Sequence, residues 1–245
     1  MITASIVLYN ENIKTLRKTV DSFLNAPLEK KLYLIDNSFK NTLQSYFNHP
    51  QIEYIFVGKN IGFGSAHNLI LHKVNSKYHL ILNPDLEFKS AVIQTLIREL
   101  EKNLETSFIT PKVLYPNNSL QFICRKHPSF FDLINRKLEI SKKNIHKNEY
   151  RNQNLEEPFY PEFIHGCFML FKTEDFKSIN GFDQRYFLYM EDADLCRKID
   201  DKGKKKLYFP SVEVIHQHRK GSSKSVKLFF YHFISAMKYF LKWGF

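Results

Sequence analysis

Four short apolar runs near the start of the chain limit the folds that it can adopt. Helix-length segments separate the runs, which cover residues 4–9, 32–35, 52–57 and 79–82. Strands made almost entirely of Val, Ile, Leu and aromatic residues, without alternation, are those that helices cover on both faces. The spacing therefore predicts an α/β fold with a mostly parallel central sheet. Helices are expected at 13–24, 64–74 and 90–103, and a further apolar strand at 163–171.

A polar cluster follows each of these runs. The clusters are Tyr9-Asn10-Glu11, Asp36-Asn37-Ser38, Lys59-Asn60-Ile61-Gly62 and Asn83-Pro84-Asp85. Ligands of open parallel sheets bind outside the carboxyl ends of the strands, so the four clusters are expected to converge on one site. Any one cluster is also explained by helix capping or turn formation. The four together favour a ligand site.

Asp85 is the first candidate for metal chemistry, because it follows a buried run after Asn83 and the stiffening Pro84. A carboxylate oxygen suits a hard divalent cation. Mg²⁺ or Mn²⁺ bound by one carboxylate and by substrate phosphates would neutralise a pyrophosphate leaving group. Taken alone, the tripeptide 83–85 is better explained as a simple turn.

A basic segment near the C-terminus offers further ligands. His216 and His218 alternate with Gln217, so both face one side if the strand persists, and one of them can bind a metal. Arg219 and Lys220 follow directly and can reach phosphate. Two histidines beside a basic run are weak evidence by themselves.

A second acidic cluster, Glu191-Asp192-Ala193-Asp194, opens a predicted helix. Asp192 shares a helical stripe with Leu195 and Ile199, which predicts that it points toward the body of the domain. A carboxylate at a helix N-terminus is stabilised as the anion, the form required of a base that accepts a proton from a substrate hydroxyl. The alternative is a favourable charge at a helix start without chemistry.

The composition of the chain limits which binding partners are expected. The formal charge is +11, so the surface should attract phosphorylated ligands, polyanions or anionic lipid. Lys and Arg are spread along the chain rather than gathered on one helix, which argues against nucleic acid. Cys124, Cys167 and Cys196 include no C-x-x-C pair, which argues against disulfides and a zinc site and indicates a reducing compartment. The start of the chain has no basic leader, so a cytoplasmic location is expected.

Four motifs in order carry a resemblance to a known family. They are 60–68 (Asn-Ile-Gly-Phe-Gly-Ser-Ala-His-Asn), 83–85, 187–197, and 216–218 before Gly221-Ser222-Ser223. In these motifs the chain resembles the inverting glycosyltransferases called family 2, and more narrowly their rhamnosyltransferase-like branch, which has the GT-A nucleotide-binding fold. The resemblance covers nearly the whole chain except 117–161.

The resemblance implies a nucleotide-sugar donor at the strand ends. Tyr9 and Asn10 would lie beside the nucleoside, and Asp36 would contact the base. Asn60 with Gly62 would shape the loop that approaches the donor. The branch favours dTDP-rhamnose as the donor.

The resemblance also implies roles for the acidic residues. Asp85 matches the metal-binding position, whereas Asn83 replaces a carboxylate that is more usual in the family and leaves the site less charged. The catalytic base corresponds to the acidic pair, in which the helical stripe favours Asp192 and leaves Glu191 as the reserve candidate. The base would deprotonate an acceptor hydroxyl that attacks the anomeric carbon opposite the nucleoside diphosphate and inverts its configuration. Bacterial members of the family often build surface polysaccharides on lipid-linked acceptors at the cytoplasmic face, so a saccharide or lipid-linked saccharide is the expected acceptor.

The chain is expected to comprise a catalytic domain, 1–223, and a C-terminal amphipathic helix, 224–245. Residues 117–161 are irregular and basic, which is typical of a variable or mobile excursion. In the C-terminal helix, apolar residues recur at steps of three and four: Val226, Phe229, Phe230, Phe233, Met237, Phe240 and Leu241. This helix is expected to pack on its own domain or on a second copy in a homodimer, or else to bind an anionic membrane peripherally.

Two other functions stay open at this point. A nucleotidyltransferase acting on sugar phosphates would share the parallel sheet, the metal and the phosphate contacts. Such enzymes commonly carry a glycine-rich basic loop after the first strand, where this chain has Leu8-Tyr9-Asn10-Glu11-Asn12. A non-catalytic carbohydrate- or membrane-binding module would use the aromatic residues and leave the acidic clusters unexplained.

Overall fold

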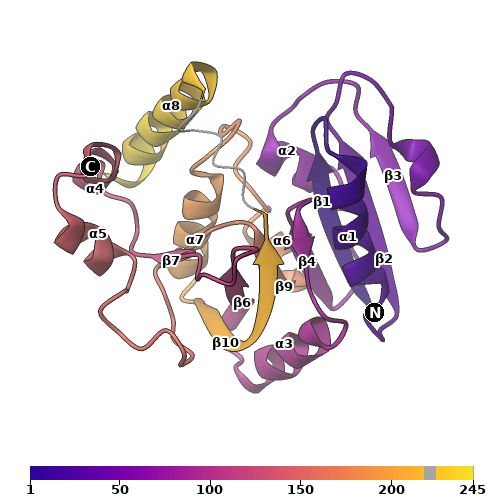
Figure 1. The fold of residues 1–245 in the computed structure, drawn as a ribbon, viewed down its shortest axis with the longest axis horizontal. Helices are drawn as coiled ribbons and strands as arrows, with labels where there is room; N and C mark the ends of the chain where they lie inside the picture. The colour runs from indigo at the N-terminus through magenta and orange to yellow at the C-terminus, as the bar shows by residue number, and fades with distance from the viewer. Residues whose placement is uncertain (218–224, 245) are drawn as a thin grey trace.

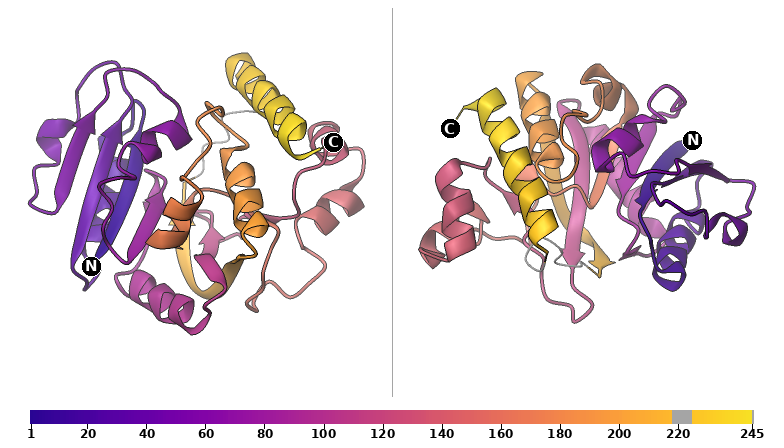
Figure 2. Two further views of the ribbon diagram at one scale, coloured as in Figure 1. Left: turned by 180° about the vertical axis from the view of Figure 1, so that it is seen from behind. Right: turned by 90° about the horizontal axis from the view of Figure 1, so that it is seen from above.

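A computed structural model describes residues 1–217 and 225–244. Within these residues, an eight-stranded sheet runs through the molecule in the order β3-β2-β1-β4-β9-β6-β10-β5. Helices cover both faces of the sheet (Figure 1), and the view from behind in Figure 2 shows the same layers. The predicted α/β fold with a mostly parallel central sheet is confirmed.

The N-terminal half of the sheet is wholly parallel. β1 (Ile2–Leu8) lies between β2 (Lys30–Asp36) and β4 (Tyr78–Leu82), and β3 (Ile52–Phe56) adds to the outside of β2. Parallel strands place their carboxyl ends at one edge of the sheet, as the polar clusters require.

Two helices cover this half of the sheet on opposite faces. α1 (Ile13–Leu24) begins after Asn12, whose side chain accepts the first free backbone N–H groups, and packs Leu16, Val20 and Phe23 into the main core. α2 (Phe63–Asn68) packs Ala66 on the other face, against Val7 and Ile35. The helix expected at 64–74 thus ends early, and hydrogen-bonded turns continue to Val74.

The other half of the sheet contains an antiparallel strand. β9 (Phe168–Lys172) runs antiparallel to both of its neighbours, β4 and β6 (Thr106–Leu114), and β10 (Lys205–His216) runs parallel to β6. The short β5 (Leu86–Glu87) closes this edge. The helices of this half are α3 (Ala91–Lys102), α6 (Thr173–Ser178) and α7 (Glu191–Asp201).

The strand expected at 163–171 is interrupted. β8 (Phe163–Ile164) pairs with β7 (Cys124–Arg125) in a separate two-stranded sheet, and β9 begins only at Phe168. Residues 165–167 therefore cross between two sheets. This crossing brings backbone N–H groups to the edge where the polar clusters lie, as described below.

The segment 117–161 contains more regular structure than its sequence indicated. Besides β7, it includes α4 (Phe130–Leu138) and α5 (Lys142–Asn148), which pack on each other. Residues 117–161 therefore form a small helical layer beside the main sheet (Figure 1). Elsewhere in the chain, a 3₁₀ turn (Gln44–Tyr46) lies between β2 and β3.

The predicted C-terminal helix is present as α8 (Val226–Trp243), with Ser225 as its N-cap. It lies across α7 and beside α4 (Figures 1 and 2) and buries Ser235, Ala236, Tyr239 and Phe240. The Phe240 ring packs edge-on against Phe130 of α4, with centroids 6.0 Å apart. One face of the helix thus belongs to the fold.

The buried face of α2 rests on a polar network within the sheet. Ser5 Oγ lies 2.7 Å from His67 Nδ1 and 3.0 Å from His79 Nε2, and Thr3 Oγ1 lies 2.8 Å from His79 Nδ1. Burial lowers the pKa of His79 to about 3 and the pKa of His67 well below its usual range. Both histidines are therefore neutral at pH 7, and they anchor α2 through hydrogen bonds rather than charge.

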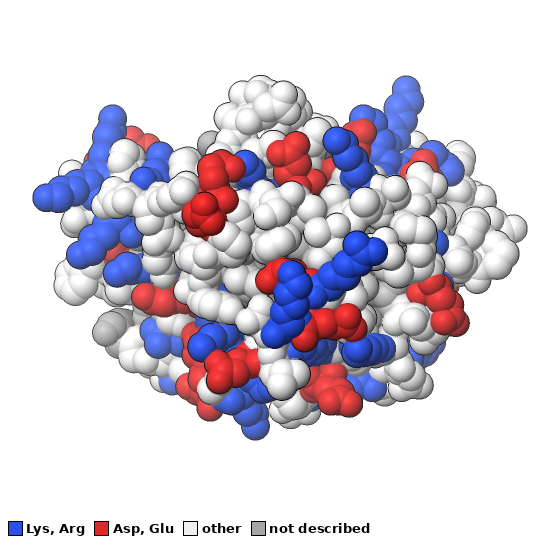
Figure 3. All heavy atoms as spheres, turned by 90° about the horizontal axis from the view of Figure 1, so that it is seen from below, with Lys and Arg blue, Asp and Glu red and all other residues white. Residues whose placement is uncertain are grey.

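The positive charge does not gather into one band on the face that Figure 3 shows. On that face, Lys and Arg side chains alternate with Asp and Glu side chains. The structure contains exposed ion pairs, such as Lys18 with Glu87 at 2.9 Å and Lys77 with Glu101 at 2.7 Å. Such pairs contribute little to stability.

Candidate functional site

The first two polar clusters meet at the ends of β1 and β2. Tyr9 and Asn10 are both exposed there, and Asn10 adopts a left-handed conformation with φ 54°. The Asn10 N–H donates to Ser38 Oγ at 2.9 Å. The two residues predicted to lie beside the nucleoside are thus held at the strand ends with their side chains accessible.

Asp36 lies in the same region but is fully buried. Its Oδ1 accepts the Ser38 N–H at 2.9 Å, and its Oδ2 accepts the Tyr54 hydroxyl at 2.6 Å. Burial and the bond to Asp36 raise the pKa of Tyr54 above its usual range, so this phenol stays protonated and donates. Asp36 therefore shapes the loop after β2. Its direct contact with the base of the nucleotide stays a prediction.

The third cluster forms a tight loop before α2. Asn60 Oδ1 accepts the Gly62 N–H at 3.0 Å, and Asn37 Nδ2 donates to the Gly62 carbonyl at 3.1 Å. Gly62 has φ 92°, and a Cβ built on it would overlap the carbonyl oxygen of Phe187. Asn60 and Gly62 thus shape this loop through its approach to residues 182–187.

Replacing Gly62 with Ala is expected to lower the free energy of unfolding by about 3 kcal/mol, because it combines left-handed strain with a backbone clash. The loop at 60–62, called the donor loop below, should move, so binding of the nucleotide sugar should also weaken. Urea denaturation measures the change in stability, and calorimetric titration measures the change in binding. Gly203→Ala is the matched control, since Gly203 has φ 67° but nothing within 4 Å of a built Cβ. Equal stability losses in the two variants, with unchanged donor binding, would show that the close approach at Gly62 is unimportant.

The fourth cluster meets the end of β10. Asp85 Oδ1 lies 3.1 Å from His216 Nε2, and Asn83 Nδ2 lies 3.4 Å from the same nitrogen. Burial lowers the pKa of His216, but the hydrogen bonds to Asp85 and Cys167 and the charges of these two groups together outweigh burial, and the pKa rises to about 10. A protonated imidazole is not a metal ligand, so a metal at this site would have to displace that proton.

The structure adds Gln121 to this cluster. Its Oε1 lies 3.0 Å from His216 Nδ1, and its Nε2 donates to the His216 carbonyl at 2.7 Å. An acceptor at Nδ1 fixes the imidazole so that Nε2 faces Asp85. Gln121 belongs to the segment 117–161, and nothing in its local sequence indicates this long-range contact.

The side chains around Asp85 suit a divalent cation that takes most of its ligands from substrate phosphates and water. Over residues 1–217 and 225–244, no three His, Cys, Asp or Glu side chains are grouped to hold a metal. Mg²⁺ commonly binds through one or two carboxylates plus phosphate and water oxygens, which matches Asp85 with a diphosphate. His218, Arg219 and Lys220, also predicted to bind metal or phosphate, lie outside the described residues.

The acidic pair begins α7, but the two carboxylates differ in environment. Glu191 is buried, whereas the Asp192 side chain is 17% exposed. Burial, and then the charge of Asp192, raise the pKa of Glu191 well above its usual range, so Glu191 retains a proton. The helical stripe predicts that Asp192 points inward and that Glu191 flanks it, but Glu191 is the more buried of the two residues. The helix α7 packs on β8.

The crossing at 165–167 joins the acidic pair to the fourth cluster. The Gly166 N–H donates to Asp192 Oδ2 at 3.1 Å, and His165 Nδ1 lies 3.5 Å from the same oxygen. One residue further on, the Cys167 carbonyl accepts the Asn83 N–H at 2.9 Å. The segment 165–167 thus contacts Asp192 on α7 and the backbone of Asn83, two residues before Asp85. The contacts of His165 and Gly166 with Asp192 could not be predicted, because the apolar residues around them indicated an uninterrupted strand.

Comparison with known proteins places the chain among glycosyltransferases. Residues 3–179 match the family described as Glycosyl transferase family 2, and residues 151–220 match the family described as N-terminal domain of galactosyltransferase. Rhamnosyltransferase WbbL of Escherichia coli (strain K12) is 31% identical over 229 residues, covering 88% of this chain and 84% of that protein. An N-acetylglucosaminyl-diphospho-decaprenol L-rhamnosyltransferase of Mycobacterium tuberculosis (strain ATCC 25618 / H37Rv) is 26% identical over 203 residues, covering 75% and 65%.

Solved structures agree on the fold. GalNAc-T7, crystallised with UDP, GalNAc and Mn²⁺, superposes with a TM-score of 0.69 at 17% identity, covering 90% of this chain and 43% of that chain. The mannosyltransferase PcManGT from Pyrobaculum calidifontis, in complex with GDP-Man and Mn²⁺, superposes with a TM-score of 0.62 at 15% identity, covering 90% and 57%. At these identities the likeness establishes the fold alone.

The family match spans most of the chain, and the relative from Escherichia coli aligns over nearly its whole length. The two other functions left open by the sequence, nucleotidyl transfer and non-catalytic binding, are therefore set aside. The chain belongs to Glycosyl transferase family 2, and it is a rhamnosyltransferase-like glycosyltransferase with the GT-A fold.

Proposed function

We propose that this protein is an inverting glycosyltransferase that moves rhamnose from dTDP-rhamnose to a saccharide or lipid-linked saccharide during surface polysaccharide biosynthesis. The observation that carries the proposal is the position of Asp192, a partly exposed carboxylate that accepts the Gly166 N–H of the segment 165–167, whose Cys167 carbonyl accepts the Asn83 N–H. Two relatives named as rhamnosyltransferases support the choice of sugar.

Asp192 is the proposed general base. Its Oδ2 accepts the Gly166 N–H and its Oδ1 accepts the Ala193 N–H at 2.9 Å, so the carboxylate is held in one orientation. Each oxygen keeps a further lone pair for the proton of an acceptor hydroxyl. That hydroxyl attacks the anomeric carbon as the bond to the nucleoside diphosphate breaks, which inverts the configuration in one step. Glu191, which keeps its proton, is poorly suited to this role.

The donor would be held at the strand ends by Tyr9, Asn10, Asn60 and Asn83, with Arg219 and Lys220 reaching its phosphates. Asp85 and His216 would hold Mg²⁺ or Mn²⁺. The two solved structures with a similar fold both contain Mn²⁺, which supports such a cation. When bound, the cation would neutralise charge on the leaving diphosphate.

A hydrolysis screen tests the donor proposal. Purified protein is incubated with UDP, dTDP and GDP sugars in the presence of Mn²⁺ or Mg²⁺, without acceptor, and release of the nucleoside diphosphate is measured. Turnover of dTDP-rhamnose above the others supports the proposal. Turnover of a UDP or GDP sugar alone would reject rhamnose and leave glycosyl transfer in place.

We further propose that α8 and α4 hold the protein peripherally on an anionic membrane, at the cytoplasmic face where a lipid-linked acceptor would be presented. Within the described part of the chain, no helix has the length and apolar character needed to cross a bilayer. α8 nevertheless exposes one apolar face, with Val226 74%, Phe230 56%, Phe233 51% and Leu241 75% accessible. On the neighbouring α4, Phe131 and Leu138 are also exposed, and Lys137 lies over the Phe229 ring. Apolar side chains bordered by cations suit an anionic lipid surface.

Replacing both Phe230 and Phe233 with Asn is expected to reduce binding to phosphatidylglycerol vesicles by about tenfold or more, because two exposed aromatic side chains are lost from the contact. Flotation at low ionic strength measures the effect, and added salt should weaken the wild-type binding. Phe240, which the sequence pattern also assigned to this face, is buried against α4 and is unsuitable for the test.

The matched control replaces two exposed apolar residues elsewhere, Tyr46 and Leu104, with Asn. This control should float as the wild type does. If the wild type itself stays unbound at low ionic strength, the membrane proposal is wrong. A rise in mass with concentration, measured by light scattering, would then identify a second copy of the chain as the partner of α8.

A further inference from the structure

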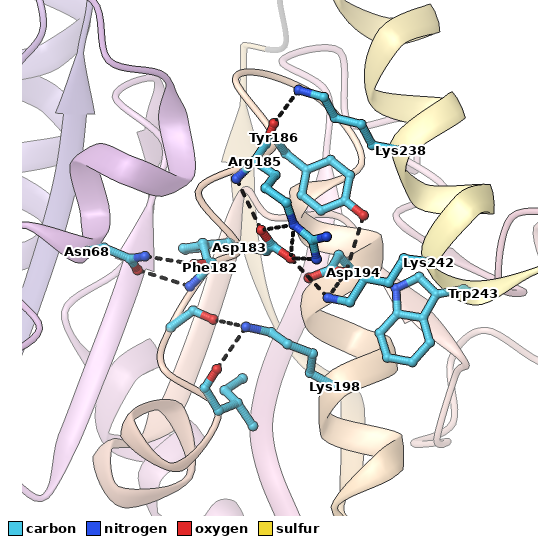
Figure 4. A network of polar contacts seen from close by, with 12 residues as sticks. Asn68, Phe182, Asp183, Arg185, Tyr186, Asp194, Lys198, Lys238, Lys242 and Trp243 are labelled. Atoms are coloured by element: carbon cyan, nitrogen blue, oxygen red, sulfur yellow. Dashed lines mark hydrogen bonds and ion pairs between the residues drawn. The ribbon is translucent and has the colours of Figure 1, made fainter.

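We infer that Asp194, together with Lys242 and Trp243 in the last turn of α8, positions the candidate base. The inference rests on the proposed role of Asp192, which lies two residues before Asp194 in the first turn of α7. Figure 4 shows the network around Asp194, in which side chains from α8 and from the loop before α7 converge. These residues act through Asp192 and are not proposed to touch substrate.

Asp194 is fully buried, and one of its oxygens takes three hydrogen bonds. Oδ1 accepts from Lys242 Nζ at 2.6 Å, from Trp243 Nε1 at 2.8 Å and from the Tyr186 hydroxyl at 3.3 Å. A buried carboxylate is costly unless it is paired and hydrogen-bonded. Here the donors come mainly from α8, so α7 can bury this carboxylate only while the end of α8 is docked.

The turn that leads into α7 is strained, and α8 holds it as well. Tyr189 and Met190 are consecutive non-glycine residues with φ 70° and 65°. Such a conformation persists only where the surroundings impose it. Ser235 Oγ donates to the Leu188 carbonyl at 2.9 Å, and Lys238 Nζ donates to the Arg185 carbonyl at 2.6 Å. The direction in which α7 leaves this turn, and with it the position of Asp192, therefore depends on α8.

The same loop reaches the donor side of the site. The Phe63 N–H donates to the Phe187 carbonyl at 3.1 Å, and the Asn68 side chain bonds both the N–H and the carbonyl of Phe182, at 2.9 and 2.7 Å. Lys242 Nζ also lies 3.0 Å from Asp183 Oδ2. Residues 182–190 thus contact the donor loop on one side and α8 on the other. A shift of α8 would change the distance between base and donor.

The first experiment replaces Lys242 with Met and measures kcat and the donor KM separately with a soluble acceptor. Small displacements of a reacting group can cost up to about 100-fold in rate, so we expect kcat to fall between about 10- and 100-fold. The donor KM should change by less than about threefold, since the substitution leaves the nucleotide contacts in place. Lys242→Arg keeps a cation at this position and should restore most of the rate.

A double-mutant cycle separates positioning from a merely structural role. If Lys242 acts through Asp192, then Lys242→Met should lower the residual rate no further in an Asp192→Asn background. Equal losses of rate with and without Asp192 would overturn the inference. An Asp192→Asn enzyme with full activity would instead reject the proposed base, so the two failures are distinguishable.

Asp200→Asn is the matched control, because it also removes a carboxylate that pairs with a lysine, Lys206, on the same helix. Asp200 lies in the last turn of α7, away from the candidate base, so its substitution should destabilise the protein while leaving kcat unchanged. A loss of kcat equal to that of Lys242→Met would mean that α7 is merely sensitive to destabilisation, and the inference would fail.

Trp243→Phe covers the case in which Lys242→Met does not fold. It removes one hydrogen bond to Asp194 and keeps an aromatic ring, so the protein should fold and lose about two- to fivefold in kcat, because Lys242 and Tyr186 still donate to Asp194 Oδ1. That loss should also vanish in the Asp192→Asn background. A Trp243→Phe enzyme with wild-type kcat would overturn the inference.

Discussion

Asp192→Asn is expected to lower the rate of glycosyl transfer by about 1,000-fold, within the range that general-base catalysis contributes. The amide is nearly the same shape but cannot accept the proton of the acceptor hydroxyl. Binding of the nucleotide-sugar donor should stay within about threefold of wild type, because the base acts on the acceptor. Initial rates of transfer and calorimetric titration with the nucleoside diphosphate measure the two effects.

Glu191→Gln is the matched control for this variant. Glu191 is buried and keeps its proton, so the neutral amide resembles its normal state and the rate should change little. The opposite pattern, with activity lost in Glu191→Gln and kept in Asp192→Asn, would move the base to Glu191. Membership of the family would be unaffected by that result.

Removing the metal site is the second large effect. Asp85→Ala should weaken donor binding in the presence of Mn²⁺ and lower activity by about 100-fold, which corresponds to the several kcal/mol that a Lewis-acidic cation supplies. Excess EDTA should suppress wild-type activity to a similar level, and Mn²⁺ or Mg²⁺ should restore it. Steady-state rates at several metal concentrations measure both effects.

The variant also serves as an internal control. If EDTA acts through the cation at Asp85, it should reduce the residual activity of Asp85→Ala no further. Full wild-type activity in excess EDTA would remove the metal from the mechanism. Arg219, Lys220 and loop amides would then have to neutralise the diphosphate unaided.

Local patterns in the sequence predict the N-terminal half of the fold well. The expected helix at 13–24 coincides with α1, and all four apolar runs are parallel strands. The runs in β1, β2 and β4 reflect burial between two helical layers, whereas β3 lies at the edge of the sheet and is only partly buried. Long-range pairing is harder to predict. β9 is as apolar as the other strands, and nothing in its residues reveals that it runs antiparallel between β4 and β6.

The candidate site shows the same division. The carboxyl ends of parallel strands meet by geometry, so the grouping of Tyr9, Asn10, Asn60 and Asp85 is predictable. Helical periodicity selects a face but does not say how deeply the first turn is covered, and Glu191 proved to be more buried than Asp192. Gln121 and His165 escape prediction because their partners are far away in the sequence.

The place of β9 in the sheet also bears on how the protein folds as it is synthesised. β4 ends at Leu82 and β6 at Leu114, but the strand that joins them begins only at Phe168. Until the ribosome has released that strand, β4 presents an unpaired apolar edge of the kind that templates aggregation. Closure of the sheet is a late, long-range event, and the crossing at 165–167, which meets Asp192, is set at that same step. The main sheet and the candidate site therefore form in the same step of folding.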